Sequence, residues 1–321
     1  MLIGIDIGGT KCAVSLGNEA GQVLEKRRFP TPANVNEAIE KLLGAAEELA
    51  GKAPAADPVR AAGISCGGPL NEAEGIVLSP PNLPGWDRIP VKKLAEDRLK
   101  VPAGLMNDAN ACALAEYRLG AGRGAEVMVF MTFGTGLGAG IVIGGRLLRG
   151  ANGNGGELGH IRLADFGPAG YGKAGSFEGF CSGSGLRQLA LTLGAEAAGR
   201  GERVPWFSPE GANENVNAKM LQDQADTGEP AALKVYSLCG RMLGKGLAIV
   251  VDMLNPDRII IGSIFARARH LLEPEMYRTL EKEALPQSLK ACTIVPPELG
   301  EGLGDAAALT VAAITLDNTK N

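Results

Sequence analysis

Leu2–Leu16 reads LIGIDIGGTKCAVSL, a pattern typical of a buried strand, a glycine turn and a returning strand. The first strand covers Leu2–Ile7, the turn is Gly8-Gly9-Thr10, and the second strand covers Lys11–Leu16. A near copy lies at Val127–Ile143, where VMVFMT is a strand, FGTGLG a glycine turn and AGIVI a strand. Two halves that each open with the same unit indicate an internal duplication at the domain level.

The length of 321 residues exceeds the usual size of one domain, so two domains of ~150 residues each are expected. The boundary between the halves is predicted in the glycine-rich stretch Gly120–Glu126. The predicted division is a small α/β domain of residues 1–120, completed by a C-terminal helix at 304–321, and a large α/β domain of residues 121–303. The C-terminal helix is expected to pack back on the first domain.

Helical and strand patterns alternate along the rest of the chain, which predicts an α/β fold. The further predicted strands are Val23–Phe29, Val59–Ser65, Ala103–Met106, Arg146–Leu148 and Asp257–Gly262. The predicted helices are Asn36–Lys52, Val91–Arg98, Ala111–Leu119, Leu186–Ala198, Asn215–Thr227, Ala231–Leu254, Leu271–Glu283 and Gly304–Leu316. The glycine-rich stretch Gly150–Gly185 is expected to be a long polar loop.

Composition and charge narrow the functional classes. Hydrophobic residues make up 45% of the chain and charged residues 21%, as in ordinary soluble globular proteins. The net charge of −4 gives no basic footprint for nucleic acid or an anionic membrane, and no apolar stretch approaches ~18 residues. Six scattered cysteines without a C-x-x-C pair favour reduced thiols. With no signal sequence ahead of the first strand, a cytoplasmic protein with no nucleic-acid or membrane partner is expected.

Asp108 is the strongest candidate for the chemistry. It lies in Leu105–Asn110 (LMNDAN), where an apolar strand ends and a helix begins, so two backbone segments hold its carboxylate. That placement suits a general base. The helix N-terminus is expected to keep the carboxylate ionised near neutrality and to lower its basicity somewhat. The alternative is that Asn107 and Asp108 only cap the helix, since Asn and Asp are common caps.

The two glycine turns are candidates for phosphate binding, because glycine has no side chain to block the approach of backbone N–H groups to phosphate oxygens. They join strands in hairpins and follow neither the G-x-x-x-x-G-K-[ST] nor the helix-opening G-x-G-x-x-G spacing. Asp6 is placed to hold a magnesium ion through water, and Lys11 can approach phosphate as a point charge. Plain β-turns are the alternative. The hydroxyls of Thr10 and Thr135, one in each copy, favour phosphate binding.

A third group of polar residues follows in the glycine-rich loop. Glu157, His160 and Glu178 offer two carboxylates and an imidazole, which suit several neighbouring hydroxyls of one small polar molecule. A histidine in a loop is more often structural than functional. The two carboxylates favour ligand binding here.

These motifs resemble those of the ROK (repressor, ORF, kinase) family of sugar kinases, and the match covers nearly the whole chain in order. The fold that this resemblance implies is the two-domain α/β fold of actin, Hsp70 and hexokinase, of the ribonuclease H-like type, with the active site in the cleft between the domains. The matching segments are GIDIGGTK at Gly4–Lys11, GGP at Gly67–Pro69, PNLPGW at Pro81–Trp86, NDANACALAE at Asn107–Glu116, TFGTGLGAGIV at Thr132–Val142, GNGGELGH at Gly153–His160, LNPDRIIIG at Leu254–Gly262 and LGDAAAL at Leu303–Leu309.

The resemblance also implies roles for single residues. It makes Asp108 the catalytic base and places the Gly67-Gly68 turn beside the sugar. The residues that it implies for binding the sugar are Asn82, Asn107, Asp108, Glu157, His160 and Glu178. Those that it implies for the nucleotide are Asp6, Gly8, Gly9, Thr10, Lys11, Thr135 and Gly136 around the phosphates and magnesium, and Gly262 near the adenosine.

The chain departs from the family pattern at two places. The family usually follows its histidine with a C-x-C-G-x-x-G-C zinc motif, and here that place reads AGYGKAGS at Ala169–Ser176. No structural zinc and no other protein-held metal site are therefore expected, and packing of Tyr171, Phe177 and Phe180 is expected to hold the loop. The second departure is Gly262-Ser263, where the family commonly has a glycine pair.

The function predicted from the sequence is an ATP-dependent sugar kinase that needs Mg²⁺ and acts on a hexose, with glucose as the first guess. A homodimer is expected. Kinases for fructose, mannose, N-acetylmannosamine or N-acetylglucosamine are alternatives, as is a non-catalytic sugar-binding or sugar-sensing regulator. The family's repressors carry a helix-turn-helix before the kinase-like part, whereas this chain begins at the first strand.

Overall fold

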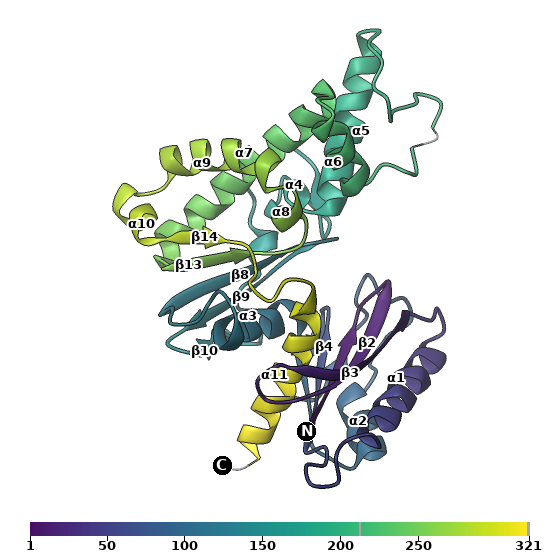
Figure 1. Ribbon diagram of the computed structural model, residues 1–321. Helices are drawn as coiled ribbons and strands as arrows, with labels where there is room; N and C mark the ends of the chain where they lie inside the picture. The colour runs from purple at the N-terminus through teal and green to yellow at the C-terminus, as the bar shows by residue number, and fades with distance from the viewer. Residues whose placement is uncertain (212, 320–321) are drawn as a thin grey trace. The chain divides into compact units, whose positions relative to one another are not determined.

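The computed structural model describes residues 1–211 and 213–319 of the chain, and Figure 1 shows its helices and strands. The chain divides into two compact units. Unit 1 consists of Met1–Gly124, Gly140–Gly155 and Pro297–Asn321, and unit 2 consists of Ala125–Ala139 and Gly156–Pro296. The sequence assigned residues 140–155 to the large domain, and its domain boundaries stay a prediction.

The sheet of unit 1 has five strands in the order β3-β2-β1-β4-β7. β2 pairs antiparallel with β1 and β3, while β4 is parallel to β1 and to β7. Nearly every residue of β1 is buried, as expected for a central strand that is covered on both faces. The strands are β1 (Leu2–Ile7), β2 (Lys11–Gly17), β3 (Val23–Pro30), β4 (Ala61–Cys66) and β7 (Ala103–Asn107).

Helices cover both faces of this sheet (Figure 1). α1 (Val35–Ala50) and α2 (Val91–Leu99) enclose the main hydrophobic core with β1, β2 and β4. α11 (Leu303–Asn318) packs on the other face, where α3 (Asp108–Leu119) lies against it. The expected packing of the C-terminal helix on the first unit is confirmed. A short hairpin of β5 (Leu70–Asn71) and β6 (Ile76–Val77) follows β4.

Three glycines on neighbouring strands allow α11 to approach the sheet closely. Gly4, Gly63 and Gly104 are register partners across β1, β4 and β7. A Cβ atom at Gly63 would lie 2.2 Å from the backbone oxygen of Ala308, and one at Gly104 would lie 2.1 Å from Oγ1 of Thr315. Both neighbours belong to α11, so the helix packs directly against bare strand backbone.

Replacing Gly63 by alanine should therefore destabilise the fold. The new methyl group would meet backbone atoms of α11 that cannot rotate away, and overpacking of this kind typically costs about 1–3 kcal/mol. Gly44, inside α1, is the matched control, because a Cβ there meets no heavy atom within 4 Å. Gly44→Ala should gain up to about 1 kcal/mol from helix propensity. Urea unfolding would measure both, and a Gly63→Ala variant as stable as the wild type would contradict the close packing.

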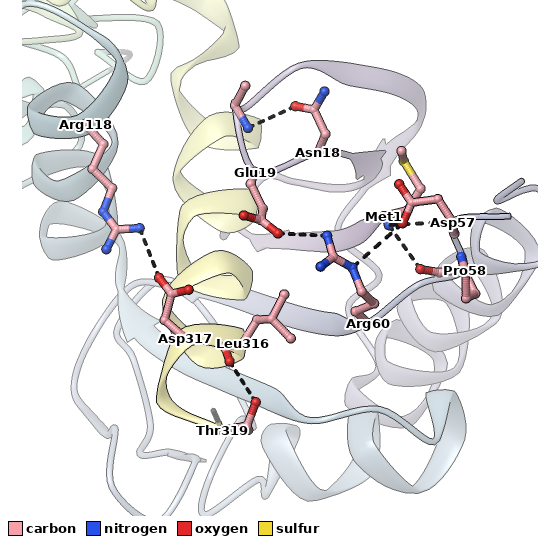
Figure 2. Close-up of polar contacts among 11 residues, drawn as sticks. Met1, Asn18, Glu19, Asp57, Pro58, Arg60, Arg118, Leu316, Asp317 and Thr319 are labelled. Carbon is pink, nitrogen blue, oxygen red and sulfur yellow. Dashed lines mark hydrogen bonds and ion pairs between the residues drawn. The ribbon is translucent and has the colours of Figure 1, made fainter. Parts of the chain in front are cut away.

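Charged contacts occur at the N-terminus of the chain and on the last turns of α11, as Figure 2 shows. The N-terminal ammonium of Met1 donates to Oδ1 of Asp57 at 2.6 Å. Arg118 of α3 lies 4.0 Å from the Asp317 carboxylate on α11. These pairs are partly exposed, so each contributes little to stability.

The second sheet repeats the plan of the first, in the order β10-β9-β8-β13-β14. A glycine hairpin again supplies its first strands, and β13 is parallel to β8 and to β14. The predicted duplication of the strand and glycine-hairpin unit is thus seen in both sheets. The strands are β8 (Val127–Phe133), β9 (Leu137–Ile143), β10 (Arg146–Leu147), β13 (Arg258–Ile261) and β14 (Thr293–Val295).

The long helix α7 (Pro230–Leu254) is the centre of the helical layer of unit 2, where it packs on α9 (Arg269–Glu283), α5 (Gly183–Gly199) and α6 (Ala218–Asp226). Three further short elements were not predicted. They are α8 (Ile264–Arg267), α10 (Pro286–Ala291) and the 3-10 helix η2 (Gly300–Gly302). None of the helices in the described part of the chain is long and apolar enough to cross a membrane.

The prediction of a long polar loop at Gly150–Gly185 is wrong from Leu158 onward. Short elements occur there, each too brief to show a periodic pattern in the sequence. They are the 3-10 helix η1 (Leu158–His160), the two-residue strands β11 (Ala169–Gly170) and β12 (Lys173–Ala174), and the helix α4 (Phe177–Phe180).

Candidate active site

The site residues predicted from the sequence fall into two groups, one in each unit. Unit 1 holds Asp6, Gly8, Gly9, Thr10, Lys11, Gly67, Gly68, Asn82, Asn107 and Asp108. Unit 2 holds Thr135, Gly136, Glu157, His160, Glu178 and Gly262.

Asp108 is the first residue of α3, directly after the end of β7. Asn107 caps the helix, because its Oδ1 accepts hydrogen bonds from the N–H groups of Ala109 at 3.0 Å and Asn110 at 3.4 Å. Oδ1 of Asp108 accepts a hydrogen bond from Ala109 at 2.8 Å. The predicted cap is therefore confirmed for Asn107, and the second carboxylate oxygen of Asp108 faces the turn at Gly67.

The turn after β4 lies beside these two polar side chains. A Cβ atom at Gly67 would lie 3.8 Å from Oδ2 of Asp108, and one at Gly68 would lie 3.3 Å from Nδ2 of Asn107. The two glycines keep the space next to a carboxylate oxygen and an amide nitrogen free of side chains. This arrangement allows a small polar molecule to approach both groups.

Loss of hydration raises the pKa of Asp108. Solvent reaches the residue, yet the protein atoms around its carboxylate displace part of its hydration and raise its pKa above the usual value. The backbone N–H groups of Ala109 and Asp108 lower the pKa, but they are the weaker influence. The sequence predicted a lowered basicity, and that prediction is wrong in direction. A carboxylate with a raised pKa is the better proton acceptor once it is ionised.

The pKa of Asp6, near the end of β1, is also raised. Burial is the largest cause that raises its pKa, and the charges of Asp108 and Asp305 act in the same direction. Lys26 and Lys11 lower the pKa only in part, and the result is a pKa of about 6. Negative charge is thus in excess at this place, which favours a cation. Magnesium prefers oxygen ligands and often takes one or two carboxylates beside phosphate oxygens and water. A single half-buried carboxylate fits that requirement, although no three potential ligand side chains gather among the described residues.

Asp305 is a neighbour of Asp6 that the sequence reasoning missed. Its buried carboxylate accepts a hydrogen bond from Ser15 Oγ at 2.9 Å and forms an ion pair with Lys26. The available signal was its place in the motif LGDAAAL, at the start of the helix that packs on β1.

The first glycine hairpin is closed by its own backbone. Gly8 N–H donates to the Lys11 carbonyl at 3.2 Å, and the Thr31 hydroxyl donates to the Gly8 carbonyl at 2.6 Å. A Cβ at Gly9 would lie 2.4 Å from the Asn82 carbonyl oxygen. Asn82, expected beside the sugar, therefore lies against the predicted phosphate turn.

The second hairpin is supported by the start of α5. Gly183 N–H donates to the Gly134 carbonyl at 2.8 Å, and the Ser184 hydroxyl donates to the Thr135 carbonyl at 3.0 Å. Gly262 lies at the end of β13, where its N–H donates to the Met131 carbonyl at 2.9 Å.

Glu178, one of the predicted sugar-binding residues of unit 2, contacts this second hairpin. Its Oε2 accepts the N–H of Leu137 at 2.9 Å, and a Cβ at Gly136 would lie 2.7 Å from the same oxygen. Gly159 lies against the Leu137 carbonyl, where a Cβ would be 2.3 Å away. The turn that carries His160 and the helix that carries Glu178 therefore lie beside the Thr135-Gly136 turn.

Glu157 directly precedes η1 and His160 is its last residue, and both side chains are exposed. The His160 ring contacts the edge of Tyr171, with ring centroids 6.4 Å apart. Lys173 donates to the His160 carbonyl at 2.8 Å. A carboxylate and an imidazole thus face solvent beside the structured turn, where they are accessible to a ligand.

Two of the three aromatic residues expected to hold the zinc-less loop do so. Phe177 and Phe180 are buried, and Phe177 packs so closely on Gly246 of α7 that a Cβ there would lie 2.3 Å from its ring. The expectation for Tyr171 is wrong, because its side chain is 71% exposed and lies at a turn with φ of 45°.

A metal chelator should leave the stability of the protein unchanged, because no structural zinc is expected. Ala169, Tyr171 and Ser176 stand where thiolates would be needed, and a structural zinc site normally has four nitrogen or sulfur ligands. Treatment with EDTA should not shift the thermal unfolding midpoint. Stoichiometric zinc in elemental analysis of the purified protein would contradict this prediction.

Ser263 shows why a glycine suits the position after Gly262. Its backbone has φ of 56° and ψ of −116°, a conformation that residues with a side chain rarely adopt. Such strain costs of order 1–3 kcal/mol. The serine side chain does not offset it by capping α8.

Ser263→Gly should therefore raise the free energy of unfolding by about 1 kcal/mol, after the greater freedom of glycine in the unfolded chain is subtracted. Ser182 is the matched control, since it caps α5 at φ of −146° with its side chain bonded to the Gly185 N–H. Ser182→Gly should lower stability slightly. Thermal unfolding of both variants would test the difference, and destabilisation by Ser263→Gly would contradict the strain.

The chain is similar to known proteins over most of its length. The model of the ROK family matches residues 2–315. A glucokinase of Streptomyces coelicolor is 34% identical over 263 residues, which cover 82% of this chain and 81% of the relative. An N-acetylmannosamine kinase of Escherichia coli is 31% identical and covers 90% of this chain and 92% of its own.

Solved structures resemble the whole chain. A ROK hexokinase from Thermus thermophilus superposes with a TM-score of 0.81 at 29% identity and covers 99% of both chains. A ROK family glucokinase from Streptomyces griseus, solved with glucose and AMPPNP, gives 0.76 at 29% identity and covers 98% of this chain and 99% of its own. A ROK family transcriptional regulator gives 0.81 at 26% identity and covers 98% of this chain and 78% of its own.

These likenesses confirm the predicted two-domain fold of the actin and hexokinase type. The family model spans nearly all of the sequence, and the relatives match most of their own length. The chain belongs to the ROK family.

Proposed function

We propose that the protein is an ATP-dependent sugar kinase that transfers the γ-phosphoryl group of ATP to a hydroxyl group of a hexose, with glucose as the first candidate. The observation that carries the proposal is the carboxylate of Asp108, which has a raised pKa and an oxygen turned toward the open Gly67 turn. The relatives named glucokinase and hexokinase support the same reaction.

Asp108 acts as the general base in this proposal. Its Oδ2 accepts the proton of the sugar hydroxyl while that oxygen attacks the γ-phosphorus, and the bond from phosphorus to the β-γ bridging oxygen breaks. The products are a sugar phosphate, ADP and one proton. Asn107 keeps its Oδ1 on the helix cap, so its Nδ2 group is the part available to donate to a sugar oxygen.

Unit 2 supplies the further groups proposed to bind the sugar. Glu157 and Glu178 accept hydrogen bonds from sugar hydroxyls, and His160 donates or accepts according to its tautomer. Glu178 also fixes the Thr135-Gly136 turn through Leu137. The same carboxylate can therefore couple the position of the sugar to that of the turn proposed to bind phosphate.

The two glycine turns bind the phosphates of ATP in this proposal, with Lys11 as an added positive charge. Asp6 is the residue that fits a magnesium ion, held directly or through water. Magnesium supplies neutralisation of phosphate charge during the transfer. Gly262 and Ser263 are proposed to lie beside the adenosine.

Transfer to a panel of hexoses tests the proposal and identifies the sugar. Purified protein would be incubated with Mg-ATP and glucose, fructose, mannose, N-acetylmannosamine or N-acetylglucosamine, and ADP release would be followed with and without each sugar. Sugar-dependent ADP release is expected, with the highest kcat/KM for glucose. A higher value for an N-acetylated sugar would keep the kinase and change the substrate.

A sugar-sensing regulator is the second candidate, favoured by the ROK transcriptional regulator that superposes over nearly this whole chain. Such a protein would bind a sugar without turning over ATP. Calorimetric titration of the same sugars would show binding, while the transfer assay would stay at background. That pair of results would replace the kinase by the sensor.

A homodimer is proposed for the protein in solution. Three large apolar side chains of unit 2 are exposed. Ile249 and Met253 are one turn apart on α7, and Leu285 lies beside the same helix, because its backbone N–H donates to Oδ1 of Asp252 at 2.9 Å. Ile249 is 38% exposed, Met253 62% and Leu285 50%. Light scattering of the purified protein would give its mass, and a monomer would contradict the proposal.

A further inference from the structure

Glu72 contacts the segment that carries the candidate base. It lies in the turn of the small hairpin after β5, and its side chain is only 15% exposed. Oε1 accepts a hydrogen bond from the backbone N–H of Asn107 at 3.0 Å. Oε2 forms an ion pair with the Arg149 guanidinium. One carboxylate thus connects three segments that are far apart in the sequence.

The bond to Asn107 fixes the residue that precedes Asp108. Asn107 ends β7 and caps α3, so its side chain is held by the helix and its backbone N–H by Glu72. A hydrogen bond to an ionised acceptor is stronger than one between neutral groups. Because the side chain and the backbone N–H of Asn107 are both held, the position of Asp108, the first residue of α3, is restricted.

Arg149 holds the other side of Glu72. Its guanidinium is half exposed, but its backbone is fixed, because its carbonyl accepts the Gly155 N–H at 2.9 Å and closes the loop from 149 to 155. Because the backbone of Arg149 is held by this hydrogen bond, its ion pair with Glu72 restrains the orientation of the Glu72 carboxylate.

We propose that Glu72 is a positioning residue for Asp108, and that Arg149 holds Glu72 in its orientation. The inference rests on the proposed kinase function, in which Asp108 accepts the proton of the sugar hydroxyl. Neither residue belongs to the motifs that revealed the family. A shift of the base by about 1 Å can lower the rate on the order of a hundredfold. Glu72 fixes the backbone of Asn107, next to the base, and it can therefore affect catalysis without touching the substrate.

The variants separate the two contacts of Glu72. Glu72→Ala removes both, Glu72→Gln keeps an oxygen acceptor for Asn107 and loses the ion pair, and Arg149→Met removes only the ion pair. Glu74→Gln and Arg146→Met are matched controls, because both residues are exposed and lie near the tested ones in sequence.

The expected result is a fall in kcat with a nearly constant KM for sugar. Glu72→Ala should lower kcat by about 100-fold. Glu72→Gln and Arg149→Met should each lower it by less, and by similar amounts, while the controls match the wild type. Partial rescue by glutamine distinguishes positioning from a general loss of folding. If Glu72→Ala does not fold, the comparison of Glu72→Gln and Arg149→Met with their controls decides.

Hydrogen exchange of the Asn107 amide provides a readout that does not depend on turnover. It should become faster in Glu72→Ala and stay slow in Glu72→Gln. Unchanged exchange in Glu72→Ala, or a kcat equal to that of Glu74→Gln, would overturn the inference. A rise in KM for sugar with unchanged kcat in Arg149→Met would overturn it too, because Arg149 would then bind the substrate. If the wild type transfers no phosphate, the proposed function fails, while amide exchange still tests the contact.

Discussion

Asp108→Asn is expected to lower kcat by at least about a hundredfold while the fold and most of the sugar affinity remain, since positioned general bases contribute roughly 10²- to 10⁴-fold. An amide of the same shape cannot accept the hydroxyl proton. It can still accept the hydrogen bond of the Ala109 N–H, which the Asp108 carboxylate accepts at 2.8 Å. Steady-state turnover beside sugar titration would measure both parts of the prediction.

A role in capping alone predicts a different result for this substitution. Asn caps helices as well as Asp, and Asn107 already caps α3, so the swap would then be nearly silent. Asp97→Asn is the control, since Asp97 is exposed and pairs with Lys93, one turn earlier in α2. The raised pKa of Asp108 adds a pH test. Wild-type activity should fall on acidification already above the ordinary carboxylate range, because protonation removes the base.

Glu157→Gln should weaken sugar binding by roughly 10- to 150-fold and leave ATP binding nearly unchanged, because a hydrogen bond to a charged acceptor contributes about 1.5–3 kcal/mol. Glu157 precedes η1 with an exposed side chain, beside the turn that carries His160. Calorimetric titration with each ligand separately would measure both affinities. Glu281→Gln, on the exposed face of α9, is the control. Equal losses for sugar and ATP would show that Glu157 supports the structure of unit 2 instead.

The regular elements of the fold could be predicted because their signals are local. The duplicated glycine hairpins predicted the strand and hairpin unit that both sheets contain, and the helix from Asp108 could be located from its Asn cap and its helix-forming residues. Long helices such as α7 have enough turns to show their spacing. The resemblance to the ROK family then supplied roles that spacing alone cannot give.

The parts that could not be predicted depend on contacts between distant segments. The glycines of β1, β4 and β7 are far apart in sequence, and only the paired strands show that they form one row under α11. Glu72 and Asp305 meet their partners only in the folded chain.

The direction of the Asp108 pKa shift was mispredicted for a related reason. A helix N-terminus can be recognised in the sequence, whereas the crowding of protein atoms around the carboxylate cannot. Tyr171 was expected in the core because it is aromatic, but a two-residue hairpin places it at an exposed turn.

The most direct measurement of the central claim is the identification of the phosphorylated product by ³¹P NMR. Wild-type protein would be mixed with Mg-ATP and glucose, and the same sample would be prepared with Asp108→Asn. Sugar phosphate and ADP should form in equal amounts in the wild type and should be almost absent in the variant. Absence of any sugar phosphate with the wild-type protein, while calorimetry shows that the sugar binds, would contradict the kinase and identify a sugar sensor.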